Sequence, residues 1–382
     1  MRKLFKLLVT LIVAFSFTLL STGCQFIDKV KDFIWVEDSV EDNSSNDSIS
    51  EVTSEEGPLN SADIEVIGDS DFSIHFLELG NEFTGDSTYI KVGDVDILID
   101  AGSRKNSAST IINYVDQFCT DNTLEYVIAT HAHQDHIAGF IGLSGQEGVF
   151  EHYKTETIID YPKTNATSKI KQEYEEKRDA ENATHYTALE CWNNKNGAKR
   201  EYKISDKVTM SILYQKFYEE KSSDENNYSV CVLFTYKGNN YLFTGDLEKE
   251  GEESLVANNT LPKCTLFKGG HHGSPTSNTT QLLEVIDPDI VCVCCCCGSD
   301  EYTSNVANMF PSQQFVDNIS KFTDAVYVTT IIDDESKFTS LNGNIIIYFV
   351  EDKLTLRCTN NNKKFKDTDW FKANRTLPNE WN

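Results

Sequence analysis

The chain has 382 residues and a formal net charge of −26, from 60 acidic and 34 basic side chains. Because affinity for long polyanions comes chiefly from Lys and Arg, this balance argues against duplex nucleic acid as a partner. A bound metal could reverse the charge locally, so a small anionic or phosphorylated substrate remains compatible with the composition.

The first residues have the pattern of a secretory signal. A basic stretch precedes an uncharged apolar run from Leu7 to Leu20, which is too short to span a bilayer comfortably. The next residues resemble a bacterial lipoprotein cleavage site before Cys24, although Ser21 stands where an aliphatic residue is usual. We predict a signal peptide over residues 1–23 and lipidation of Cys24, which would anchor the protein to the outer face of the cell membrane. A plain secreted form or an uncleaved anchor is the alternative.

The domain organisation follows from composition. Residues 24–62 contain a Ser-, Asn-, Asp- and Glu-rich stretch with little to bury, which predicts an acidic disordered tether. Apolar runs are spread over residues 63–358 and favour one elaborated domain. Residues 359–382 form an Asn- and Lys-rich polar tail with no recognisable motif.

Short β-rich runs bounded by turn residues predict the elements in chain order. A helix is expected over residues 108–118, and the charged stretch 163–200 is expected to be a helical insertion beside the pocket. Residues 237–240, Lys-Gly-Asn-Asn, are a hairpin signal. Strands are expected at residues 72–79, 87–92, 95–99, 125–129, 157–160, 207–213, 228–236, 241–244, 264–267, 289–298, 325–329, 344–350 and 354–358.

The segment His131-Ala132-His133-Gln134-Asp135-His136, called the cradle below, directly follows the expected strand 125–129. Imidazoles two residues apart at a strand end can point into the same space, and neutral imidazoles with a carboxylate suit zinc and similar ions. Hydrolytic metal chemistry is therefore the leading hypothesis. The alternative is a polar loop of hydrogen-bonded histidines.

Two more polar clusters stand at strand ends further along the chain. One is Thr244-Gly245-Asp246, and the other is Gly269-Gly270-His271-His272-Gly273-Ser274. Between these clusters and the tail lies a run with Cys292 and Cys294 to Cys297, which favours a buried strand of free cysteines. Neighbouring strand residues face opposite sides, so the run converges poorly on one ion, but a soft-metal or redox site is the alternative.

The cradle, the strand ending at Asp246 and the Gly-His-His-Gly-Ser turn, in that order, resemble the metallo-β-lactamase superfamily. Within it, the chain looks most like the hydrolase domain of ComEC-like competence proteins. The resemblance runs from about Phe72 to Val350. It implies an α/β fold, the αββα sandwich of two mixed β-sheets flanked by helices, with a metal site along one edge.

Carried over by residue, the resemblance implies two divalent ions. His131 and His133 would hold one, Asp135 and His136 the other, and Asp246 would bridge them. Zinc is the default metal, but this mixture of nitrogen and carboxylate ligands would also accept manganese or iron.

The adjacent histidines are expected to have different roles. We favour His272 to complete the second site and His271 to face the substrate. Together with Asp135 and Asp246, His271 is thus a candidate catalytic residue.

Three further residues match supporting positions of the family. Asp100 would orient the cradle, while Asp86 and Asn227 match elements near the pocket. For each, ordinary turn chemistry is the alternative. Many family members have one more histidine between the cradle and the bridging aspartate. His185 is the better candidate for it than His152, with a surface helix histidine as the alternative.

One element of the ComEC branch is incomplete here, because the Gly and His of its Asn-x-Tyr-Gly-His-Pro element are missing near Asn308 to Pro311. We therefore do not carry over the branch's DNA-directed activity. The sequence predicts a membrane-anchored extracellular hydrolase of phosphodiester type, in which a water bridging two ions attacks the substrate. β-Lactam or lactone hydrolysis and a non-catalytic surface binding lipoprotein are the alternatives.

Overall fold

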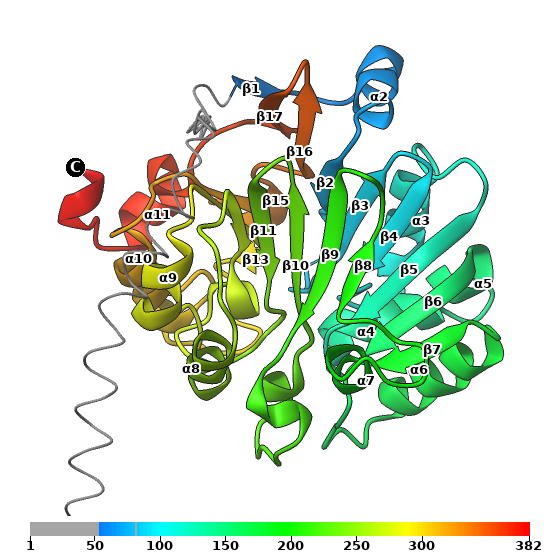
Figure 1. Cartoon of the computed structure of the whole chain (residues 1–382). Coiled ribbons are helices and arrows are strands. Elements are labelled where there is room, and N and C mark those ends of the chain that lie inside the picture. The colour runs from blue at the N-terminus through cyan, green and yellow to red at the C-terminus, as the bar shows by residue number, and fades with distance from the viewer. Residues whose placement is uncertain (1–52, 81) are drawn as a thin grey trace, which may run out of the picture. The chain divides into compact units, whose positions relative to one another are not determined.

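The computed structural model describes residues 53–80 and 82–382, which contain two mixed β-sheets (Figure 1). The first sheet has nine strands in the order β1-β17-β16-β2-β3-β4-β5-β6-β7 within these residues. The strands are β1 (Thr53–Glu56), β2 (Ser73–Phe76), β3 (Thr88–Val92), β4 (Val95–Ile99), β5 (Thr123–Ala129), β6 (Lys154–Asp160), β7 (Thr184–Thr187), β16 (Ile345–Val350) and β17 (Lys353–Cys358).

The second sheet of the described residues has eight strands in the order β15-β14-β13-β12-β11-β10-β9-β8. Its middle strands run parallel and the strands toward both edges run antiparallel. The strands are β8 (Glu201–Lys203), β9 (Val208–Leu213), β10 (Cys231–Tyr236), β11 (Asn239–Phe243), β12 (Leu266–Lys268), β13 (Ile290–Cys297), β14 (Val326–Ile332) and β15 (Phe338–Ser340).

Helices cover the outer faces of the two sheets (Figure 1). Beside the first sheet lie α3 (Ser107–Val115), α4 (Gln134–Ile141), α5 (Val149–His152) and α6 (Lys169–Ala180). Beside the second lie α8 (Lys249–Asn258), α9 (Thr280–Ile286), α10 (Gln313–Ile319) and α11 (Asp369–Asn374). The remaining helices are α2 (Ser61–Gly68), α7 (Ala188–Trp192) and the short 3-10 turns η1 (Lys216–Tyr218), η2 (Glu225–Tyr228), η3 (Gly270–Gly273), η4 (Val306–Asn308), η5 (Phe365–Asp367) and η6 (Asn379–Trp381). The αββα sandwich expected from the sequence is confirmed.

The core between the sheets is rich in aromatic side chains. The Phe72 and Tyr241 ring centroids are 5.0 Å apart, and Phe76 stacks on Phe243 at 6.0 Å. Each such ring buries on the order of 150–250 Å² of surface. Because strand residues alternate between faces, the outward side chains of the second sheet form another apolar cluster beneath its helices.

Most predicted strands are observed within a few residues of their expected bounds. The hairpin between β10 and β11 turns at Lys237 and Gly238, whose φ values are 47° and 79°. Positive φ at both central residues gives a turn whose twist matches the right-handed twist of the strands. The Lys-Gly-Asn-Asn pattern therefore predicted this hairpin correctly. The insertion at 163–200 is helical in part, but β7 also extends the first sheet at its edge.

The sequence predicted a disordered tether as far as residue 62, and this is wrong for its described part. Strand β1 pairs in parallel with β17, and Asn60 caps α2. Glu55 also forms an ion pair with Arg357 at 2.8 Å. These polar residues are ordered by backbone pairing rather than by burial, which composition does not reveal. The predicted signal peptide, Cys24 and the earlier part of the tether lie outside the described residues.

The C-terminal segment also differs from the expected polar tail. Phe365, Phe371 and Trp381 are buried in the apolar cluster on the outer face of the second sheet. Three well-spaced aromatic residues among polar ones anchor the segment, although no periodic pattern announces a helix. In the part of the chain that the structure describes, none of the helices combines the length and apolarity needed to cross a membrane.

The cysteine run forms β13, and its buried-strand interpretation is confirmed. Cys292 and Cys294 face the core between the sheets, whereas Cys295 and Cys297 face the outer cluster. Cys292, Cys294, Cys295 and Cys297 are free and buried. They serve as small apolar side chains on both faces of a central strand.

Candidate metal centre

The cradle connects β5 to α4 at the edge of the first sheet. His131 and His133 lie in the connection, whereas Asp135 and His136 lie in the first turn of α4. The segment that follows β4 packs closely on this turn, because a Cβ atom at Gly102 would lie 1.5 Å from the backbone oxygen of Asp135. Glycine is therefore needed at residue 102 to let the helix start where it does.

The second sheet contributes Asp246 and His272. Asp246 follows β11, and His272 lies in η3 after the parallel strand β12. The carboxyl ends of adjacent parallel strands meet at one edge, which is where ligands bind in α/β sheets. His271 and His272 have φ values of 48° and 54°, so the chain turns sharply here.

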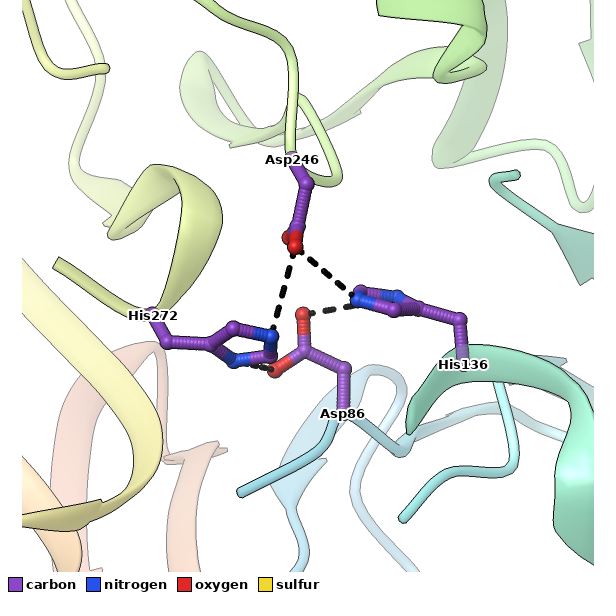
Figure 2. Close-up of side chains that lie close together, drawn as sticks. All are labelled: Asp86, His136, Asp246 and His272. Carbon is purple, nitrogen blue, oxygen red and sulfur yellow. Dashed lines mark ion pairs between the residues drawn. The ribbon is translucent and has the colours of Figure 1, made fainter. Parts of the chain in front are cut away.

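Four buried side chains converge between the two sheets (Figure 2), and one ligand atom from each lies within 4.8 Å of the others. They are Asp86, His136, Asp246 and His272, called the ligand cluster below. Oδ2 of Asp246 lies 3.2 Å from Nε2 of His136 and 3.3 Å from Nε2 of His272. Asp135 adjoins the cluster, with Oδ2 3.5 Å from Nε2 of His272.

The ligand cluster fits a divalent cation. Nε2 of His136, Nε2 of His272 and both carboxylate oxygens of Asp246 have no hydrogen-bond partner in the described part of the chain, although all are buried. A buried polar atom without a partner costs about 1–3 kcal/mol. Imidazole nitrogens and carboxylate oxygens are suitable ligands for zinc, manganese and iron. A cation would supply the missing partner for all of these atoms.

The histidines and carboxylates of the ligand cluster attract one another, and this attraction shifts the pKa of each. Although burial alone would lower the pKa of the two histidines, Asp246 and Asp100 hold the pKa of His136 well above its usual value. Asp246 and Asp86 raise the pKa of His272 in the same way. Burial alone would raise the pKa of Asp246, yet the two histidines keep it well below its usual value. A metal ion must therefore displace protons from this site.

His131 and His133 form a pair beside the cluster. Nε2 of His131 is 3.0 Å from Nδ1 of His133. The ring centroid of His131 is 4.2 Å from that of His136. Burial keeps the pKa of His131 well below its usual value, so its ring is neutral and able to bind a metal. Neither histidine belongs to the closest group of ligand atoms among the described residues. Their binding of a separate ion stays a prediction.

Two carboxylates orient the cluster histidines. Oδ2 of Asp100 is 2.7 Å from Nδ1 of His136, and its two oxygens accept hydrogen bonds of 2.8 Å from Thr130. Asp86 lies 3.3 Å from Nδ1 of His272 and forms a buried ion pair with Lys268. Asp86 is thus part of the cluster rather than of the pocket mouth. The sequence did not predict a role for Lys268, which is a single lysine at the end of the apolar strand β12.

His271 faces outward from the cluster. Its Nε2 lies 3.8 Å from Oδ2 of Asp246, and its side chain is 17% exposed. Nδ2 of Asn226, which was not predicted, is 3.4 Å from the same nitrogen. The predicted Asn227 instead accepts a hydrogen bond of 3.3 Å from the backbone of Glu248. Asn227 therefore supports the loop after Asp246 rather than a cluster histidine.

The structure does not bring His185 into the cluster. It lies on the edge strand β7, and its Nε2 is 2.8 Å from Oδ1 of Asp160. Arg178 pairs with the other oxygen of Asp160 at 2.8 Å. The side chain of His185 is 34% exposed, so a surface histidine describes it well, although on a strand instead of a helix.

A cavity of about 640 Å³ opens beside the cradle. Most of the described lining residues have polar side chains, and none of them is Lys or Arg. The lining is Ala132, His133, Gln134, Asn165, Ala166, Thr167, Ser168, Ser223, Asp224 and Glu225.

Comparisons with known proteins agree with this geometry. Residues 80–167, which include the cradle, match the model of the metallo-beta-lactamase superfamily. ComE operon protein 3 of Bacillus subtilis is 28% identical over 170 residues, covering 43% of this chain and 19% of that protein. Recombination protein 2 of Haemophilus influenzae is 26% identical over 133 residues, covering 35% of this chain and 14% of that protein. The matches thus span less than a fifth of either relative.

Among solved structures, the metallo-beta-lactamase fold protein YhfI from Bacillus subtilis covers 70% of this chain and 99% of its own, with a TM-score of 0.38 and 11% identity. The family match contains β3, β4 and the cradle, and the two sheets have the expected layered order. Residues 80–167 therefore match the metallo-β-lactamase superfamily, and the chain is similar, over less than half of its length, to competence proteins of the ComEC type.

Proposed function

We propose that the protein is a metal-dependent hydrolase of small phosphodiesters that acts outside the cell. The observation that carries the proposal is the convergence of buried, unpartnered atoms from His136, Asp246 and His272 within the described residues. Divalent ions supply Lewis acidity, which makes water a nucleophile near neutral pH and stabilises charge on a phosphoryl oxygen.

The protein's own residues hold and orient the reacting groups. Asp100 accepts a hydrogen bond from Nδ1 of His136, which leaves Nε2 of that ring free to bind a cation. Asp246 contacts His136 and His272 and can therefore join the two sides of the site. Burial lowers the pKa of His271, so we assign it as a neutral imidazole. Its Nε2 accepts from Nδ2 of Asn226 at 3.4 Å, and we infer that this nitrogen can accept a proton from a reacting group.

The cavity and the net charge support a small substrate. A polyanion needs several Lys or Arg contacts, whereas the described lining of the cavity beside His133 has Asp224 and Glu225 instead. A net charge of −26 also repels a polyanion at long range. We infer that one phosphodiester group reaches the metals and that its neutral or hydrogen-bonding remainder occupies the cavity.

A hydrolysis panel tests the reaction class. The full chain in detergent would be assayed on phosphomonoesters, phosphodiesters, lactones and β-lactams, with and without a chelator. We expect phosphodiester hydrolysis that the chelator removes and that added Zn²⁺ or Mn²⁺ restores. Asp246→Asn should be inactive, and Asp206→Asn, which removes an exposed carboxylate, should match the wild type. Turnover of lactams or lactones alone, or metal binding without turnover, would replace this proposal.

Membrane attachment through Cys24 is a separate part of the proposal and rests on the sequence. In cells expressing the full chain, we expect the wild type in the membrane fraction and Cys24→Ala in the soluble exported fraction. Membrane retention of Cys24→Ala would contradict lipid attachment at this residue.

A further inference from the structure

The loop that follows β13 brings a tyrosine to the ligand cluster. The Tyr302 hydroxyl donates a hydrogen bond of 2.8 Å to Oδ2 of Asp135. This is the same oxygen that lies 3.5 Å from Nε2 of His272. The phenol is therefore directed at the carboxylate atom that faces the cluster.

Tyr302 is held in place by aromatic packing on its inner side. Its ring stacks on Phe310 at 5.4 Å with an interplanar angle of 28°. Phe310 in turn stacks on His272 at 5.9 Å and 29°. The three rings form a continuous stack from the loop to the cluster, which limits the positions available to the hydroxyl.

Polar contacts fix the same loop at its start. Oε2 of Glu301 accepts a hydrogen bond of 3.0 Å from the backbone nitrogen of Thr84, and Glu301 also forms an ion pair with Arg104. Thr84 is close in sequence to Asp86 of the cluster. The residue next to Tyr302 is thus tied to the segment that carries Asp86 of the ligand cluster.

The C-terminal segment fixes the loop at its end. The largely buried guanidinium of Arg375 donates to the backbone oxygens of Val306, Met309 and Pro311 at distances of 2.7 to 3.0 Å. Met309 and Pro311 flank Phe310 in the sequence. Both ends of the loop are therefore tied to the folded domain, and the hydroxyl of Tyr302 is positioned before any substrate arrives.

We propose that Tyr302 is a positioning residue that holds the Asp135 carboxylate in its metal-binding orientation. This role rests on the proposed metal site. Carboxylates that bind metals are themselves hydrogen-bonded, and loss of such a partner typically weakens metal binding by about 10- to 100-fold. Among the described residues, loss of this phenol would leave this oxygen of Asp135 with the more distant contact to His272.

The test is Zn²⁺ affinity of the full chain, measured by competition with a chelator. We expect Tyr302→Phe to raise the dissociation constant about 10- to 100-fold while the melting temperature changes little. The matched control is Tyr214→Phe, which removes a phenol-to-carboxylate hydrogen bond of 2.7 Å at an exposed pair. The control should bind Zn²⁺ like the wild type.

A second variant protects the test against a local folding defect. Glu301→Gln weakens the loop anchor but keeps the hydroxyl, so it should raise the dissociation constant in the same direction by a smaller factor. Tight Zn²⁺ binding by the wild type and equally tight binding by Tyr302→Phe would overturn the role of Tyr302 alone. Failure of the wild type to bind Zn²⁺ would overturn both this role and the proposed function.

Discussion

His271 and His272 are adjacent residues in contrasting surroundings. His272 is fully buried, with Nδ1 2.9 Å from the backbone oxygen of Cys294 and Nε2 facing Asp246. His271 remains partly exposed, and its ring centroid lies 5.7 Å from that of Phe310. The left-handed backbone at both residues makes these separate directions possible, at a conformational cost of about 1–3 kcal/mol for each.

We predict that the two histidines separate metal binding from turnover. His272→Asn should lower metal affinity by at least about 100-fold, because it removes a nitrogen of the ligand cluster. His271→Asn should retain metal and lower kcat by about 10²- to 10⁴-fold, the usual range for loss of a general acid or base. Metal content and kcat of both variants check this. Metal loss in His271→Asn with retention in His272→Asn would reverse the assignment.

At this scale, the sequence indicated His136, Asp246 and His272 because each stands in a polar cluster at a strand end. It could not indicate Tyr302, whose contact with Asp135 joins positions 167 residues apart. No local pattern encodes such a contact, since it depends on how the loop after β13 folds over the other sheet.

Helix α8 supports the turn that carries the two histidines. Glu252 accepts hydrogen bonds of 2.7 and 2.8 Å from the backbone nitrogens of Asn278 and Thr279. The Asn278 amide then bonds the backbone nitrogen and oxygen of Gly270 at 2.8 and 2.9 Å. A buried carboxyl group thus fixes the backbone on which η3 begins.

Glu252 should make stability depend on pH. Burial raises its pKa from 4.5 to about 7. Below pH 4.5 the group is protonated in both states and its contribution is fully present. Above pH 4.5 the unfolded chain releases this proton, whereas the folded protein keeps it until the pH reaches about 7. The free energy of unfolding therefore falls by roughly 3 kcal/mol as the pH rises from 4.5 through 7.

Glu252→Gln cannot ionise and should lack this loss. Urea unfolding of both proteins at pH 4.5 and pH 7.5 measures it. We expect the wild type to lose roughly 3 kcal/mol more than the variant over this interval. Equal losses would show that Glu252 does not titrate in this range.

The elements that the sequence did not predict share a physical cause. Strands β1, β7 and β8 are short, mostly polar and close to sheet edges. Backbone pairing forms them, and alternation of apolar residues is weak where neither face is well buried. Central strands such as β13 carry the opposite signal, an unbroken apolar run, and were predicted.

The C-terminal segment, residues 359–382, packs on the outer face of the second sheet. Trp381 packs on Phe371 at 5.8 Å and donates a hydrogen bond of 2.9 Å to the backbone oxygen of Thr323. Arg375 lies between these aromatics in the sequence and binds the loop of Phe310. The same segment therefore contributes to the stability of the domain and holds the loop of Phe310 in place beside the ligand cluster.

Trp381→Ala should destabilise the domain by about 3–5 kcal/mol, because it leaves a cavity in a packed cluster. Denaturant unfolding measures the change. Trp192→Ala is the matched control, since Trp192 is only half-buried and should cost less. An equal or smaller effect at Trp381 would mean that the segment is not part of the folding unit.

At the scale of the molecule, the αββα sandwich was predictable because three polar motifs at strand ends, in their order, resemble the metallo-β-lactamase superfamily, and that resemblance implies this fold. The closure by residues 359–382 was not, because its aromatic anchors have no regular spacing. Their partners are spread over the second sheet and its helices.

The most direct test of the central claim is the metal content of the full chain. We predict one to two equivalents of divalent metal per chain after purification without chelator, and less than a tenth of an equivalent in Asp246→Asn. Asp206→Asn, an exposed control, should retain the wild-type content. A wild-type content well below one equivalent, with no uptake on adding Zn²⁺ or Mn²⁺, would contradict the account.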